Sequence, residues 1–76
     1  MPTFPSLSGK EVVNAFKRLG WDVARHRGSH IIMVKEDHIA TLSVPDHKEV
    51  AKGTLRSLIR SADITVAEFL NAFKRS

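Results

Sequence analysis

The apolar residues in the first part of the chain recur at the spacing of one helix face. They fall at i, i+3, i+4 and i+7 and are Val12, Ala15, Phe16 and Leu19. Ser8 and Glu11 match a capping box, in which each side chain bonds the other residue's backbone N–H. Gly20 follows the last apolar position, where a left-handed residue commonly ends a helix. This pattern predicts a helix over about residues 9–19.

The middle of the chain changes to a pattern typical of strands. Three segments rich in apolar and β-branched residues cover residues 21–27, 29–35 and 39–44. Gly28 separates the first two segments and marks a tight turn, and Pro45 ends the third. The second segment is apolar on both faces, so we expect it to be the central strand. Short turns between consecutive strands predict an antiparallel meander.

The last third of the chain predicts two further helices. After a polar connection over residues 46–53, Thr54 is the expected cap of the first of them. Its apolar stripe is Leu55, Leu58, Ile59 and Ala62. Thr65 and Glu68 repeat the capping-box pattern and open a short last helix. The order α-β-β-β-α-α favours an α+β fold, a two-layer sandwich with helices over one face of a small sheet.

Length and composition narrow the class of protein. The 76 residues support a single domain over residues 1–76 and exclude large Rossmann or barrel enzymes. The absence of cysteine excludes a disulfide framework and Cys-based zinc sites, and it fits a reducing cytoplasm. No targeting signal is visible, and no run approaches the roughly 20 apolar residues that span a membrane. We therefore expect a cytoplasmic protein with no membrane association.

The charge balance suggests a polyanionic partner. Twelve Lys and Arg against eight Asp and Glu give a net charge of +4 with His neutral. Each cation placed near a phosphate releases counterions and so favours nucleic-acid binding. One stretch contains four of these cations, which are Lys48, Lys52, Arg56 and Arg60. It fits a phosphate-tracking face beside the helix start at Gly53 and Thr54, and the alternative is an ordinary solvated helix face.

The histidines are the main candidates for chemistry. His26 and His30 are four apart but a turn separates them, and the chain has no HExxH motif, so we expect no metal site. A two-residue loop at Arg27-Gly28 would pair His30 with Arg25, and a three-residue loop would pair it with His26. Both registers put cations, including Arg27, beside an imidazole suited to acid–base work on a phosphodiester. From spacing alone, a strand histidine with no role remains the alternative.

The other two histidines and the aromatic residues have simpler interpretations. His47 lies in a loop, where function often resides, although a solvated loop histidine is the alternative. His38 lies in a polar turn, and we expect it to be solvated. Trp21 and the phenylalanines occupy core positions, so we expect them to be buried rather than to stack on bases.

Four short motifs along the chain resemble a known family. They are Ser8-Gly9-Lys10-Glu11-Val12, Gly28-Ser29-His30, Val44-Pro45-Asp46-His47-Lys48 and Gly53-Thr54-Leu55-Arg56-Ser57-Leu58. Their order and spacing resemble the HicA toxins, small ribonuclease partners of HicB antitoxins in bacterial toxin–antitoxin modules. The likeness runs from about Leu7 to Leu70.

This resemblance implies a fold, an activity and a partner. The fold is that of a double-stranded-RNA-binding domain, and the activity is cleavage of messenger RNA with His30 essential. The partner is a HicB-like antitoxin, which we expect to cover His30. One departure is visible after the second helix, where the family often has Gly and this chain has Ala62-Asp63-Ile64. Asp tolerates the left-handed conformation better than most residues, so we expect only a local cost.

The leading hypothesis is a toxin that acts as an endoribonuclease without metal or cofactor. The RNA's own 2′-hydroxyl would be the nucleophile, and His30 would be the general acid or base. The expected RNA-binding residues are Arg25, Arg27, Ser29, His47, Lys48, Lys52 and Arg56. We expect the cations to converge around His30, and these are Arg25, Arg27, Lys48, Lys52, Arg56 and Arg60. The alternatives are a non-catalytic double-stranded-RNA-binding module and a domain that docks only a protein.

Overall fold

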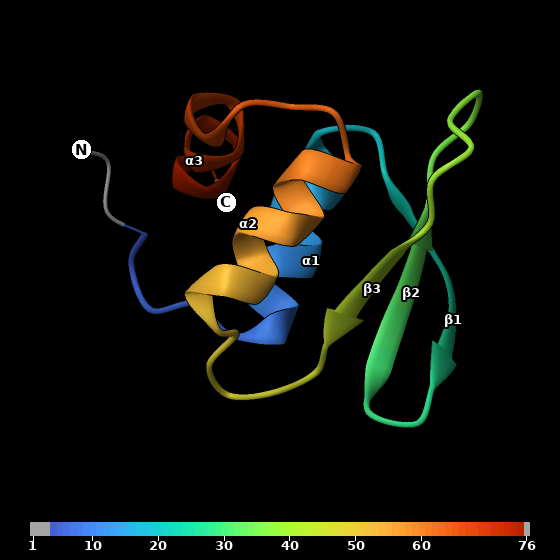
Figure 1. Cartoon of the computed structure of the whole chain (residues 1–76), viewed down its shortest axis with the longest axis horizontal. Coiled ribbons are helices and arrows are strands. Elements are labelled where there is room, and N and C mark those ends of the chain that lie inside the picture. Colours follow the sequence, from blue (N-terminus) through green and yellow to red (C-terminus); the bar gives the residue numbers. More distant parts are fainter. Residues whose placement is uncertain (1–3, 76) are drawn as a thin grey trace.

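The computed structural model describes residues 4–75 of the chain. Its elements are α1 (Gly9–Arg18), β1 (Asp22–Arg27), β2 (His30–Val34), β3 (Leu42–Pro45), α2 (Lys52–Ser61) and α3 (Val66–Lys74). The described strands form one antiparallel sheet in the order β1-β2-β3, and the helices lie on one side of it (Figure 1). The predicted α+β fold is confirmed, with the α-β-β-β-α layout of a double-stranded-RNA-binding domain and an added C-terminal helix.

The core lies between the helices and one face of the sheet. Helices α1 and α2 contact the sheet, and α3 packs on both of them away from it. Trp21 and the rings of Phe16 and Phe69 are buried, which confirms the prediction that they belong to the core. The largest fully buried side chains are Trp21, Phe16, Phe69, Leu7, Met33, Leu42, Leu55, Val12 and Val44. No helix in residues 4–75 is long and apolar enough to cross a membrane.

Helix α1 has both of its predicted boundary signals. Ser8 Oγ accepts a hydrogen bond from the Glu11 N–H, and the Glu11 carboxylate accepts one from the Ser8 N–H at 2.9 Å. Gly20 follows the helix with a φ of 98°. The Trp21 N–H donates to the Phe16 carbonyl at 3.0 Å, as in a Schellman motif. The two rings that this bond brings together pack edge to face, with centroids 6.3 Å apart.

Helix α2 begins earlier than the sequence predicts. Its N-cap is Ala51, whose carbonyl accepts from the Leu55 N–H at 2.9 Å. Thr54, the expected cap, lies within the first turn, so that prediction was wrong. Because Ala51 has no side chain that can cap, the N–H groups of this first turn have no side-chain partner. Lys52 is the first helical residue and stands at this uncapped end.

The end of α2 has an aspartate in the conformation that usually favours glycine. Asp63 adopts a φ of 60°, in the left-handed region expected for it. Its N–H donates to the Arg60 carbonyl at 3.1 Å, and the Ile64 N–H reaches back to the Ile59 carbonyl at 3.4 Å. These two bonds repeat the Schellman pattern found after α1. The helix therefore ends at the expected place with Asp where Gly is easier to accommodate.

The connection between β2 and β3 is longer than predicted. The expected third strand began at residue 39, but β3 begins at Leu42 and Ile39 is fully exposed. His38 explains the difference, because its Nδ1 accepts from the Ala40 N–H at 3.2 Å and removes that group from the strand ladder. The His38 ring also packs on Trp21, with centroids 5.0 Å apart. The prediction that His38 is only solvated was therefore wrong.

Candidate functional site

A two-residue turn sets the position of His30. Strands β1 and β2 pair so that Arg27 lies opposite His30 and His26 lies opposite Ile31. The loop is Gly28-Ser29, and of these two residues only Gly28 has a positive φ, at 61°, as in a type II′ turn. Both predicted registers were therefore wrong, since they paired His30 with Arg25 or with His26. They failed because glycine takes the first loop position, which shifts the turn along the chain.

His30 lies on the face of the sheet that the helices leave open. Residues of a strand alternate between faces, and Ile31 and Met33 of β2 are in the core. His30 therefore points to the opposite face. Arg27 is directly across from it, and Arg25 lies one cross-strand pair further along the same face. These three side chains are exposed, so the turn presents an imidazole with two guanidinium groups to solvent.

The His30 imidazole is free of internal partners. Its side chain makes no hydrogen bond or ion pair with another residue of the described 4–75 segment. No carbonyl or carboxylate of the fold therefore selects one tautomer of the ring. Both ring nitrogens are accessible to a bound molecule, which suits a group that must exchange a proton with it.

The loop after β3 is held between the hairpin turn and the start of α1. The Asp46 N–H donates to the Ser29 carbonyl at 2.7 Å, and the Gly9 N–H donates to the His47 carbonyl at 2.9 Å. A Cβ on Gly9 would collide with the Pro45 carbonyl oxygen and lie 2.9 Å from the Asp46 Cα. Three of the motifs found in the sequence, remote along the chain, thus meet at one end of the sheet.

His47 and Lys48 line a hollow at this meeting point. Its volume is about 280 Å³, and its other lining residues are Ser8, Lys10 and Asp46. The Asp46–Ser29 hydrogen bond joins this hollow to the turn that carries His30. Two of the residues predicted to bind RNA therefore stand next to the His30 turn, on the neighbouring loop.

The cations of α2 lie in more than one place. The Arg56 guanidinium sits over the Phe4 ring, 5.4 Å from its centroid, in a cation–π contact. Arg56 and Arg60 line a further hollow with Ile64 and residues at the start of α3. We expected these cations to converge around His30, whereas the structure places Arg56 and Arg60 at this separate hollow. Lys52 is exposed at the uncapped start of α2.

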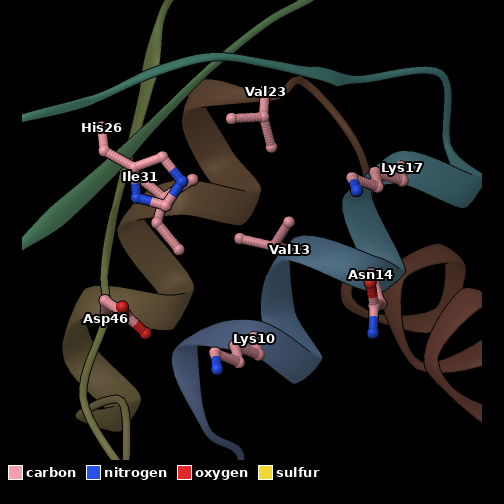
Figure 2. Close-up of a pocket in the computed structure, with 8 residues that line it drawn as sticks. All are labelled: Lys10, Val13, Asn14, Lys17, Val23, His26, Ile31 and Asp46. Atoms are coloured by element: carbon pink, nitrogen blue, oxygen red, sulfur yellow. The ribbon is translucent and has the colours of Figure 1, made fainter.

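Another hollow, which the sequence interpretation did not foresee, lies between α1 and β1. Figure 2 shows His26 and Asp46 at its edge, with Lys10 and Lys17 across from them on α1. The sequence singled out His26 as a possible neighbour of His30, whereas the register sends it to the other face of the sheet. Among residues 4–75, no three His, Asp or Glu side chains gather closely enough to hold a metal ion.

Comparison with known proteins gives one family. The family model described as the HicA toxin of bacterial toxin–antitoxin systems matches residues 9–64. The matched segment begins at the first residue of α1, includes the whole sheet and α2, and ends just after Asp63. It therefore contains His30, Arg27 and the loop with His47 and Lys48. The search of curated proteins gave no match.

Proposed function

Because this chain belongs to the HicA toxin family, and so is the toxin of a bacterial toxin–antitoxin system, we propose that it acts by cleaving messenger RNA. One observation carries this proposal: the Gly28-Ser29 turn presents His30 on the open sheet face with Arg27 directly opposite. An exposed imidazole beside a guanidinium group suits attack on a phosphodiester. The imidazole moves a proton, and the cation stabilises the charge that develops on the phosphate.

The proposed reaction uses the RNA's own 2′-hydroxyl. This oxygen attacks the adjacent phosphorus and loses its proton, while the bond from phosphorus to the 5′ oxygen breaks and that oxygen gains a proton. His30 serves one of these two proton transfers, as general base or general acid, worth typically about 10²–10⁴-fold in rate. The products are a 2′,3′-cyclic phosphate and a 5′-hydroxyl. This chemistry calls for neither a metal ion nor a cofactor.

The proposed path of the RNA backbone follows the cations near the turn. Arg25 and Arg27 share the open face with His30 and would hold the phosphate that is cleaved. The Ser29 carbonyl accepts a hydrogen bond from Asp46, which keeps the loop with His47 and Lys48 beside the turn. The next phosphate along the RNA would therefore contact that loop. The next cation along the chain, Lys52, stands at the uncapped N-terminus of α2, where N–H groups and the helix dipole favour an anion.

The partner of this toxin is an antitoxin, and we propose one of the HicB type. A growth-arresting ribonuclease must be silenced in its host, and the open face with His30 is the surface to cover. Acidic or apolar groups of the antitoxin would complement the arginines there. The complex is expected to have no nuclease activity, whereas the free toxin does.

The decisive experiment is cleavage of a defined RNA in vitro by the wild type and by His30→Ala, with and without excess EDTA. We expect the wild type to cut in EDTA and leave the two end groups above, and the variant to be inactive while unfolding at an unchanged temperature. Cleavage by His30→Ala removes His30 from the catalytic role, and loss of cutting in EDTA refutes the metal-free reaction. Intact RNA after hours, bound with steep salt dependence, favours the non-catalytic RNA-binding module.

A further inference from the structure

The hollow between α1 and β1 has an apolar floor and a polar rim. Its volume is about 260 Å³. The floor consists of Val13 and Ile31, which are 6% and 4% exposed, together with half-buried Val23. The rim consists of exposed polar residues, which are Lys10, Asn14, Lys17, His26 and Asp46. An apolar floor favours contact with an apolar face of a bound molecule, and polar groups around it can fix that molecule's orientation.

Helical and strand spacing together build this rim. Lys10, Asn14 and Lys17 fall at i, i+4 and i+7 of α1 and so share the helix face turned toward β1. His26 comes from β1, where its pairing with Ile31 turns it to the helix side of the sheet. Figure 2 shows the His26 ring beside Ile31, with the Val13 and Val23 side chains in the space between strand and helix.

The rim groups are not used by the fold itself. The side chains of Lys10, Lys17, His26 and Asp46 make no hydrogen bond or ion pair with another residue of the described 4–75 segment. Each is therefore available to a bound molecule. Two lysines against one carboxylate favour a ligand with net negative charge. The Asp46 carboxylate and the Asn14 amide oxygen can accept hydrogen bonds from a neutral polar group of that ligand, and the Asn14 amide nitrogen can donate to it.

The hollow lies directly behind the proposed catalytic turn. His26 precedes Arg27 in β1, so consecutive residues of one strand face the hollow and the open face in turn. Asp46 links the two as well, because its side chain lines the hollow while its N–H holds the Ser29 carbonyl at 2.7 Å. An RNA strand that crosses this end of the sheet would meet both.

We propose that this hollow binds one unpaired nucleotide of the RNA substrate, next to the cleaved bond, an inference that rests on the proposed ribonuclease function. The base lies over Val13 and Ile31 and can stack on the His26 ring, as unpaired bases in RNA-binding proteins do on such rings. Its edge bonds Asn14 and Asp46, and Lys10 and Lys17 hold its phosphate. The hollow thereby sets a preference for the base at the cleavage site.

Nucleotide binding can be tested without relying on catalysis. The full-length His30→Ala variant, labelled for NMR, is titrated with AMP, GMP, CMP and UMP and separately with inorganic phosphate. At least one nucleotide should shift the Asn14 side-chain amide and the His26 ring more than the others do, and phosphate should not reproduce the response. Asn14→Ala should weaken that binding about tenfold, which corresponds to about 1.4 kcal/mol. Asn71→Ala, a matched change on the exposed face of α3, should leave it unchanged.

Three results would overturn this inference. One is that no nucleotide shifts these signals, and another is that phosphate alone gives the whole response. The third is that the signals move only when an antitoxin is added, which assigns the hollow to a protein. Cleavage patterns separate the two proposals. If the wild type cuts RNA and Asn14→Ala keeps the same base preference, only the proposed role of the hollow is refuted. A wild type that never cleaves RNA refutes the proposed ribonuclease function. The NMR titration still measures nucleotide binding in the hollow in that case.

Discussion

Arg27 faces His30 across the last cross-strand pair of the β1–β2 hairpin, immediately before the Gly28-Ser29 turn. The turn fixes the two Cα atoms, and both side chains project from the open face of the sheet. Side chains directly opposite each other on one face of an antiparallel pair are neighbours, so the Arg27 guanidinium can approach a phosphate bound at His30. Arg27 is therefore the cation most directly coupled to the chemistry proposed for His30.

Replacing Arg27 should reduce catalysis without unfolding the protein. Arg27→Ala is expected to lower the rate of RNA cleavage about 10–100-fold, because it removes a charge that stabilises the developing anion at an exposed site. Lys74→Ala, which removes a cation from the exposed end of α3, is the matched control and should change the rate little. Single-turnover cleavage and the midpoint of thermal unfolding measure the two effects. Equal losses in both variants would show that only net charge matters.

The two helix-start glycines should respond to alanine in opposite ways. In Gly9→Ala the new Cβ meets the backbone of Pro45 and Asp46, so we expect destabilisation of about 1–3 kcal/mol and displacement of the loop with His47. Nothing lies within 4 Å of a Cβ at Gly53, in the first turn of α2, so Gly53→Ala should stabilise by about 0.5–1 kcal/mol. Denaturant unfolding of both variants measures the free energies, and stabilisation by both would refute the close contact at Gly9.

Glycine in place of the left-handed Asp63 after α2 should stabilise the protein. Asp63 has a φ of 60°, a conformation that glycine adopts without a Cβ clash. Asp63→Gly is expected to raise the free energy of unfolding by about 0.5–1 kcal/mol. Asp63→Ala keeps the Cβ and loses the polar side chain, so it should be less stable than the wild type. Thermal unfolding of the pair checks the sign, and RNA cleavage should stay at the wild-type rate in Asp63→Gly.

His38 should contribute to stability rather than to activity. His38→Ala removes the ring packed on Trp21 and the acceptor for the Ala40 N–H, with an expected loss of about 1–2 kcal/mol. The fluorescence of Trp21, whose indole loses its cover, should shift to longer wavelength. His47→Ala, on an exposed loop, should leave both the fluorescence and the unfolding midpoint near wild type. Unchanged stability in His38→Ala would contradict the role described for this ring.

The features that the sequence predicted correctly are local ones. The boxes at Ser8 and Thr65 and the glycine that ends α1 depend on residues three to five apart, so their geometry follows from the residues themselves. The start of α2 was misplaced because Thr54 matches a cap by type, while the cap is an alanine that no side-chain rule selects.

The candidate site was only partly predictable, because it depends on register. The motif with His30 could be found in the sequence, and the presence of cations around it could be expected. Which cation faces His30 depends on which loop position Gly28 occupies, and a shift of one residue moves every side chain of β1 to the other face. The same shift decides that His26 lines the hollow behind the sheet. The Gly28-Ser29 pair is itself a short-range signal for a two-residue type II′ loop, and placing the loop there gives the observed register.

The loop that follows β3 determines how much of the chain must be synthesised before the proposed site can form. Besides its bonds to Gly9 and Ser29, the segment ends with the Val50 N–H donating to the Leu7 carbonyl at 2.7 Å. The proposed site therefore consists of pieces from the beginning, the centre and the second half of the chain, which the fold brings together through these bonds. A polypeptide that ends before this loop has His30 but lacks the segment that ties the hairpin turn to the start of α1. We therefore expect a nascent chain to lack the proposed nuclease activity until this loop has left the ribosome and docked, so that an antitoxin has to bind only the folded toxin.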